Sequence, residues 1–139
     1  MGIIKNWLAR WTQFRKDSTA RDTDGARAET LAARYLQARG ISIVQRNFRV
    51  RGGEIDLIAR DGDITVFVEV RLRRSAVFGG ALASITPGKR RRLILAARCW
   101  LTRAHKRGGR LGNIRFDYVL LDQLSPDGIE WIRNAFTMD

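Results

Sequence analysis

Three acidic side chains fall on two short β-prone segments that a tight turn would bring together. Glu54 and Asp56 precede the Asp61-Gly62 pair, and Glu69 follows it. An Asp-Gly pair between alternating apolar residues predicts a two-residue hairpin turn, which would set Glu54 opposite Glu69 and Asp56 on the diagonal. Crowded carboxylates repel one another unless they share a cation or a proton, and hard divalent cations prefer oxygen ligands. The spacing therefore predicts a site for Mg²⁺ or Mn²⁺.

Strand alternation divides this hairpin into an apolar and an acidic face. The apolar face would hold Ile55, Leu57, Ala59, Ile64, Val66, Val68 and Val70. The acidic face could simply be solvated and paired with arginines, but Ile58 and Phe67 share it, which indicates that another element packs there. We expect the helix predicted over residues 25–39 to be this cover, because its alanines permit close approach to a sheet. Glu29 on that helix would then join the carboxylates.

Turn and capping residues divide the chain into helices and strands. Apolar residues at intervals of three and four predict a helix over residues 25–39, ended by Gly40. Thr86 as N-cap and Pro87 at the first helical position begin a second long helix, which runs to about Ala104. Strands are predicted over residues 41–48, 54–60, 63–70, 114–121 and 128–135. This order predicts an α/β domain built around a mixed sheet.

Basic residues are concentrated in the middle of the 139-residue chain. The chain has 26 Lys and Arg against 14 Asp and Glu, a net charge of +12, and residues 70–116 contain no acidic side chain. Neutralising phosphates releases their counterions, so nucleic acid is the expected partner, with DNA favoured over RNA. The amides at the start of the second helix also favour an anion. The expected phosphate-binding residues are Arg73, Arg74, Lys89, Arg90, Arg91 and Arg92.

Composition excludes other classes of protein. The single cysteine, Cys99, cannot form an internal disulfide, and the single histidine, His105, leaves no Cys/His cluster for zinc. No stretch has the length and apolarity of a membrane span or a signal peptide, so we expect a cytoplasmic protein without stable membrane insertion. Residues 1–24 are predicted to form a basic amphipathic arm and a linker, and residues 25–139 the domain proper. The arm would pack on the domain or a second subunit, or lie on a membrane surface.

The same residues carry a family resemblance. The runs GEIDLIA at 53–59 and FVEVRLR at 67–73, with GARAETLAARYLQARG at 25–40, resemble the YraN family of bacterial proteins. The resemblance covers roughly residues 25–121 and leaves out the N-terminal arm. That family is similar in turn to the PD-(D/E)xK nucleases, and more narrowly to archaeal Holliday-junction resolvases. The resemblance therefore implies a restriction-endonuclease-like mixed sheet flanked by helices.

The resemblance also implies roles for individual residues. Asp56 and Glu69 would hold the metal, with the backbone carbonyl of Val70 as a further ligand, and Glu29 would be the glutamate of the first helix. Position 71 would be that of the lysine which orients the attacking water, but Arg71 stands there. A guanidinium supplies positive charge and a bidentate phosphate contact, but it stays protonated and cannot act as a base.

Three functions follow from these features. In a metal-dependent nuclease the ion would activate a water for in-line attack on a phosphodiester and stabilise the departing oxygen, and branched DNA is the substrate that the resemblance suggests. The arginine at position 71 keeps open a catalytically weak or inactive nucleic-acid-binding protein of the same fold, unless Lys89 substitutes from the next helix. The third is a peripheral membrane protein that uses the arm. A symmetrical homodimer would suit cleavage of two strands.

Overall fold

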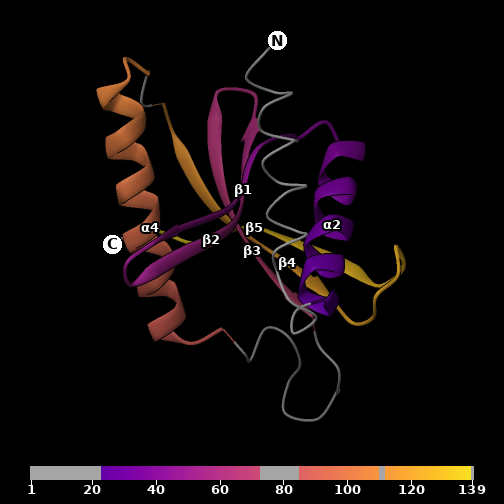
Figure 1. Cartoon of the computed structure of the whole chain (residues 1–139). Helices are drawn as coiled ribbons and strands as arrows, with labels where there is room; N and C mark the ends of the chain where they lie inside the picture. Colours follow the sequence, from indigo (N-terminus) through magenta and orange to yellow (C-terminus); the bar gives the residue numbers. More distant parts are fainter. Residues whose placement is uncertain (1–22, 73–84, 110–111, 139) are drawn as a thin grey trace.

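Within the described residues, five strands form one sheet between two helices. The computed structural model describes residues 23–72, 85–109 and 112–138 (Figure 1). The elements are α2 (Thr23–Ala38), β1 (Ser42–Val50), β2 (Gly53–Asp61), β3 (Ile64–Leu72), α4 (Pro87–Lys106), β4 (Ile114–Leu121) and β5 (Ile129–Phe136). The first of these helices begins two residues earlier than predicted, with Asp24 in the first turn, where a negative charge complements the helix dipole. The predicted amphipathic helix of the N-terminal arm lies outside the described residues.

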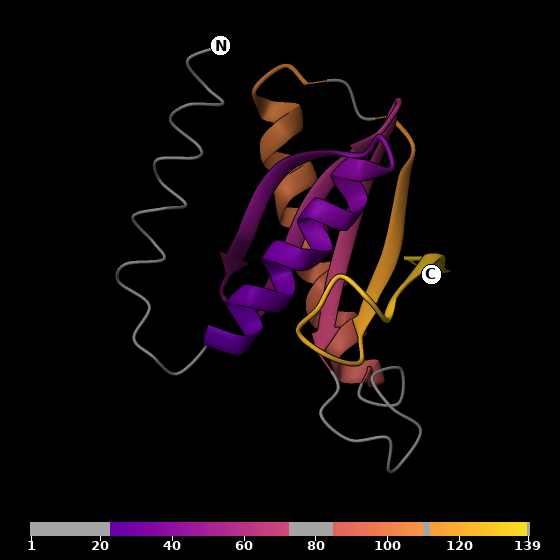
Figure 2. The same cartoon turned by 90° about the vertical axis from the view of Figure 1, so that its right-hand side faces the viewer.

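The strands lie in the sheet in their chain order, from β1 to β5. The neighbours β3 and β4 run parallel, and the other three pairs are antiparallel. A parallel pair needs a crossover connection, which α4 supplies. The two helices lie on opposite faces of the sheet, as Figures 1 and 2 show. The expected α/β domain with a mixed sheet is therefore confirmed. In the described part of the chain, neither helix combines the length and apolarity needed to cross a bilayer.

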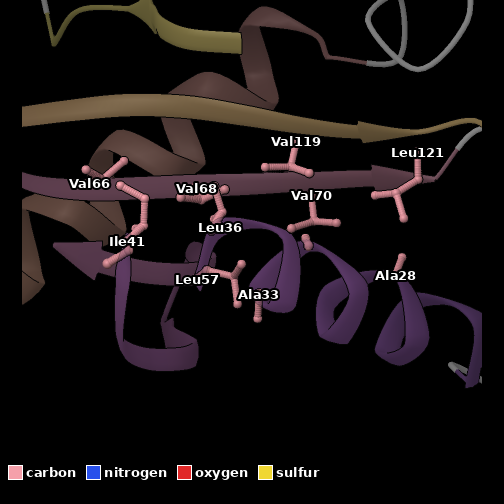
Figure 3. Packing of buried hydrophobic residues seen from close by; sticks show 12 residues of the cluster. Ala28, Ala33, Leu36, Ile41, Leu57, Val66, Val68, Val70, Val119 and Leu121 are labelled. Atoms are coloured by element: carbon pink, nitrogen blue, oxygen red, sulfur yellow. The ribbon is translucent and has the colours of Figure 1, made fainter. Parts of the chain in front are cut away.

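Helix α2 packs on the apolar face of the sheet through small side chains (Figure 3). Its buried residues Ala28, Ala32, Ala33 and Leu36 meet the strand residues Leu57, Ala59, Val66, Val68, Val70, Val119 and Leu121. The expectation that this helix covers the acidic face is therefore wrong. This face of the sheet consists of aliphatic strand residues, and burying them against the alanines of α2 removes apolar surface from water.

Helix α4 covers the face that carries Ile58 and Phe67. Its Leu93, Ala96 and Ala97 form a second core cluster with Phe48, Ile55, Ile58, Phe67 and Phe116. Trp100 of α4 meets the Phe67 ring edge-on with 5.8 Å between centroids, and its Nε1 donates to Gln45 Oε1 at 3.0 Å. Another element does pack on this face, as Ile58 and Phe67 indicated, but that element is α4.

The hairpin of β2 and β3 turns one residue later than predicted. Asp61 pairs with Ile64, which makes Gly62 and Asp63 the turn residues. Gly62 has a φ of +60° while Asp63 has no positive φ, the pattern of a type II′ turn with glycine at its first central position. The register differs from the predicted one by two residues. A shift of two keeps each side chain on its face but changes its partner, so the predicted opposition of Glu54 and Glu69 is wrong.

Ile55 is a further exception to the predicted faces. It is fully buried, but it belongs to the cluster under α4 instead of the apolar face under α2. The backbone pairing of β2 with β3 ends at Leu57 and Val68, whereas β2 stays paired with β1 as far as Gly53. Ile55 therefore lies in the part of β2 that is paired with β1 alone, where the predicted hairpin with β3 no longer determines its face.

Asp117 of β4 is the centre of a buried polar network on the face opposite α4. Its side chain is fully buried and accepts four hydrogen bonds: from Arg115 Nε and Nη2, both at 2.9 Å, from Trp131 Nε1 at 2.9 Å and from the Asn134 amide at 3.0 Å. Arg115 Nη1 also donates to Asp61 Oδ2 at 2.9 Å. The hydrogen bonds that Arg115 donates to Asp117 and Asp61 raise its pKa, although burial opposes them. Arg115 thus joins strands and is not one of the solvent-facing cations of the basic segment.

Gly53, the first residue of β2, lies against the main chain of α4. A Cβ atom there would overlap the carbonyl oxygen of Arg92 and lie 3.1 Å from the amide nitrogen of Ala96. We expect Gly53→Ala to lower the free energy of unfolding by about 1–3 kcal/mol, the usual cost of overpacking, as measured by urea denaturation. Gly88→Ala is the control, because the nearest atoms to its Cβ would be 3.8 Å away. Equal losses in the two variants would contradict the close approach of β2 and α4.

Candidate metal and phosphate site

Asp56 lies where β2 separates from β3. The last backbone pair between these strands is Leu57 with Val68, and the next step of the register would set Asp56 opposite Glu69. Instead of a further backbone pair, Asp56 Oδ2 accepts a hydrogen bond from the Val70 amide at 2.8 Å. The N–H and C=O of a strand residue lie on the same edge, so the Val70 carbonyl also faces this gap. The separation of the strands brings the three predicted ligands Asp56, Glu69 and Val70 together.

The two carboxyl groups are buried, and both have raised pKa values. Burial raises the pKa of Asp56, although the hydrogen bond from Val70 acts in the opposite direction. Burial also raises the pKa of Glu69, to about 9, and the neighbouring charge of Asp56 adds to this effect. The Glu69 side chain is 13% exposed. A pKa of about 9 keeps Glu69 protonated at neutral pH, and a proton is one of the two ways of relieving repulsion between crowded carboxylates. A bound cation is the other.

Two cationic side chains lie beside Glu69. Arg71 Nη2 contacts Glu69 Oε1 at 2.8 Å, and its side chain is 28% exposed. Lys89 comes from the first turn of α4. Its pKa is lowered by partial burial and by the charge of Arg71, while the charge of Glu69 raises it. The cation predicted at position 71 and the alternative cation from the next helix therefore both lie near the carboxylates.

Glu54 does not belong to the acidic group. Its side chain is 50% exposed, and its Oε2 lies 3.5 Å from Nε of Arg49 in an ion pair on the surface. Its charge contributes only smaller effects that raise the pKa of Asp56 and Glu69. Within the described ranges, no three Asp, Glu, His or Cys side chains form a metal-binding group. The predicted cluster of three hairpin carboxylates is therefore wrong, and a pair remains.

Glu29 lies on α2, on the face of the sheet opposite α4. It follows Ala28, whose side chain packs close to Leu121 of β4 (Figure 3). The role that the family resemblance implies for Glu29 stays a prediction.

The first turns of α4 present three exposed arginines, Arg90, Arg91 and Arg92. The helix begins as predicted, because Thr86 Oγ1 accepts the Lys89 amide at 3.3 Å and Pro87 follows the cap. No acidic residue lies in this first turn. Arg73 and Arg74, the other expected phosphate-binding residues, lie outside the described residues.

Tyr118 of β4 is a member of this site that the sequence analysis missed. In the parallel register of β3 and β4 it is the partner of Glu69, and its side chain is 2% exposed. Burial raises the pKa of Tyr118, and the nearby guanidinium of Arg90 acts in the opposite direction. A tyrosine among the apolar residues of a strand looks like a core residue. The register that sets it beside Glu69 depends on a crossover that no local motif encodes.

Comparison with known proteins shows the family. The sequence model of the Uncharacterised protein family UPF0102 matches residues 28–121, more than half of the chain. The chain belongs to the UPF0102 family. A UPF0102 protein of Dechloromonas aromatica is 53% identical over 123 residues, which cover 86% of this chain and 96% of that protein. One from Yersinia pseudotuberculosis is 50% identical over 121 residues, covering 86% and 97% of the two chains. One from Methylobacillus flagellatus is 49% identical over 113 residues, covering 81% and 96%.

The UPF0102 match confirms the resemblance to the YraN family. The matched segment begins at Ala28 and ends at Leu121. It therefore contains the carboxylate pair, the arginine at position 71 and the start of α4, while β5 and the N-terminal arm lie beyond it. The family description names no activity, so the function of the UPF0102 site has to be inferred from its chemistry.

Proposed function

We propose that this UPF0102 protein binds nucleic acid at a nuclease-like metal site, with Mg²⁺ or Mn²⁺ held by Asp56, Glu69 and the Val70 carbonyl. One observation carries the proposal: Asp56 occupies the gap between separating strands next to a second buried carboxyl group. Mg²⁺ commonly takes one or two carboxylates and completes its octahedron with water and phosphate oxygens. The raised pKa of both carboxyl groups supports the same conclusion, because it reflects two neighbouring carboxyl groups that are buried and that repel each other when ionised.

The residues around the pair have distinct roles in this proposal. When bound, the ion would activate a water and stabilise the oxygen that departs from a phosphodiester. Asp56 is fixed for this purpose by the Val70 amide, and Glu69 by the neighbouring Arg71. Lys89 would add a second positive charge near the phosphate, and the exposed arginines of α4 would hold the flanking backbone. DNA as the partner and a cytoplasmic location complete the proposal.

A second candidate function is nucleic-acid binding with weak or absent cleavage. The ion pair of Arg71 with Glu69, at 2.8 Å, favours it. The guanidinium occupies an oxygen that a metal ion would need, and it stays protonated at any physiological pH. We therefore expect intact binding and slow turnover in the native protein.

Incubation of the purified protein with branched, linear and single-stranded DNA and RNA, in Mg²⁺, Mn²⁺ or EDTA, tests both functions. Binding in all three conditions, with slow cleavage only in the presence of metal, is the expected result. Absence of binding to every substrate would overturn both functions. Cleavage that persists in EDTA would overturn the metal site alone. Light scattering of the same samples tests whether the protein forms the symmetrical homodimer expected from the cleavage of two strands.

The arginines of α4 should control the salt dependence of binding. We expect the triple change of Arg90, Arg91 and Arg92 to alanine to weaken binding to all sequences alike. The slope of log affinity against log salt should fall by up to about 3, because each phosphate contact contributes about 0.9. Fluorescence anisotropy between about 50 and 200 mM salt measures the slope.

The matched control for this triple variant is the double change of Arg27 and Arg34 to alanine. Both are exposed arginines of α2, on the other face of the sheet. If the α2 variant reduces the slope as much as the α4 variant, binding depends on overall charge and not on the start of α4.

A further inference from the structure

Two hydrogen-bond donors at the site are buried and, within the part of the chain that the structure describes, have no acceptor. They are Nε of Arg71 and the hydroxyl of Tyr118. Buried donors are nearly always satisfied, and leaving one without an acceptor costs stability. The hydrogen-bonding capacity of these two donors is therefore satisfied only when an acceptor binds next to them.

Both donors lie beside Glu69 on the face that α4 covers. Tyr118 and Glu69 are register partners on the parallel strands β4 and β3, and Arg71 follows Glu69 by two residues, so that it shares its face. The guanidinium of Arg90 approaches from α4, where it lies 5.6 Å from the ring centroid of Phe136. A guanidinium only donates, so Arg90 cannot accept from the Tyr118 hydroxyl. Arg71 and Glu69 retain 28% and 13% of their side-chain exposure, so the site opens to solvent next to the donors.

We propose that the Tyr118 hydroxyl and Arg71 Nε together bind one phosphate oxygen of the nucleic acid. Arg71 has an Nη2 that contacts Glu69 and an Nε that is left for a second acceptor. The Tyr118 hydroxyl is a neutral donor at physiological pH, because burial raises its pKa above the ordinary value of 10. The identity of the acceptor as a nucleic-acid phosphate rests on the proposed function, whereas the need for an acceptor rests on the two buried donors alone.

The test is the variant Tyr118→Phe, which keeps the ring and removes the hydroxyl. The melting temperature of the free protein should stay the same or rise, because the variant removes an unsatisfied buried donor. Affinity for a short labelled DNA duplex should fall about tenfold, the scale expected for one hydrogen bond to a charged group. The loss should be the same factor at low and high salt, since no charge is removed. This distinguishes Tyr118 from the arginines of α4.

Affinity is measured both in Ca²⁺, which occupies carboxylate sites, and in EDTA. Tyr35→Phe is the matched control, because Tyr35 lies on α2 with its ring 3.4 Å from the Arg39 guanidinium carbon. Affinity of Tyr118→Phe equal to that of the control in both conditions would overturn the assignment. A lower melting temperature with unchanged affinity would also overturn it, since the hydroxyl would then be structural. Inorganic phosphate is the second probe: a defect seen with phosphate alone and not with the duplex would exclude a nucleic-acid phosphate.

The outcome for Tyr118 can be separated from the outcome for the metal site. If the native protein binds the duplex but never cleaves it or binds metal, the nuclease proposal fails while the Tyr118→Phe affinity still tests the inference. If the native protein cleaves DNA and Tyr118→Phe binds and cleaves equally well, the inference alone fails.

Discussion

Asp56→Asn and Glu69→Gln are each expected to weaken Mn²⁺ binding by about 100-fold or more, because affinity at such sites follows the charge of the ligands. Any cleavage should be lost with it, while the fold and most of the affinity for nucleic acid persist. In Asp56→Asn, the side-chain amide oxygen can still accept the Val70 hydrogen bond that the native carboxylate accepts at 2.8 Å. Calorimetric titration measures metal binding, and circular dichroism measures the fold.

Glu54→Gln is the matched control, because Glu54 pairs with Arg49 on the surface and should not hold the ion. If Asp56→Asn and Glu69→Gln both unfold, or both bind metal like the native protein, the assignment of this pair is wrong. Equal losses in all three variants would show that binding depends only on the local density of negative charge.

The raised pKa of Glu69 predicts that the stability of the folded protein depends on pH. It is raised from 4.5 to about 9 in the folded protein, so the proton on Glu69 contributes stability that is complete below pH 4.5 and lost as the pH rises through about 9. In EDTA, the melting temperature of the native protein should therefore fall between pH 6 and pH 9. The fall should be larger than that of Glu69→Gln, which has no carboxyl group at this position. Saturating Mg²⁺ should reduce this difference, because the ion replaces the proton. A difference that Mg²⁺ leaves unchanged would speak against a shared site.

Arg71→Lys is expected to increase metal-dependent cleavage by about tenfold or more, within the range that one well-placed catalytic group contributes. The planar guanidinium holds Glu69 Oε1 at 2.8 Å and is wider than an ammonium, so it crowds the water position. A lysine would release this oxygen to the metal and keep the positive charge. Single-turnover cleavage of a labelled duplex in Mg²⁺ measures the rate, and anisotropy in Ca²⁺ measures binding.

Lys89→Ala provides the control for this gain. If Lys89 already supplies the ammonium, the native protein will cleave well, Lys89→Ala will abolish cleavage and Arg71→Lys will change little. Robust turnover by the native protein that Arg71→Lys reduces would show that the guanidinium itself is the effective group.

The elements of the fold could be predicted because local signals determine them. The Thr86 cap with Pro87 fixed the start of α4, and the alanine periodicity fixed α2. The helix that covers each face could not be predicted, because both faces of the hairpin carry large apolar side chains and either face could accept a helix. That choice depends on the total apolar area buried over the whole sheet, which includes Val119 and Leu121 of a strand far along the chain.

The proximity of Asp56 and Glu69 could be predicted in spite of a wrong register. A turn at Gly62-Asp63 instead of Asp61-Gly62 shifts the pairs by two residues, and the shifted register brings Asp56 and Glu69 to the first step beyond the last backbone pair, Leu57 with Val68. The only consequence of the wrong register for the acidic group was that Glu54 was wrongly included in it. Tyr118 could not be found, because the pairing of β3 with β4 is set by packing of α4 and not by a turn.

Asp117 shows what a buried carboxylate of this sheet looks like when its charge is balanced. Asp117 accepts four hydrogen bonds, two of them from the guanidinium of Arg115. In the described part of the chain, Asp56 and Glu69 together have one guanidinium contact, that of Arg71 with Glu69. Asp117 of β4 is thus an acid whose oxygens are saturated with hydrogen bonds, whereas in the described part of the chain the oxygens of Asp56 on β2 and Glu69 on β3 are only partly occupied. A divalent ion at Asp117 would have to displace donors, because each carboxylate oxygen there already accepts two hydrogen bonds, whereas at Asp56 and Glu69 it would replace a proton. The hydrogen bonds that a carboxylate already accepts therefore decide where a cation can bind in this fold.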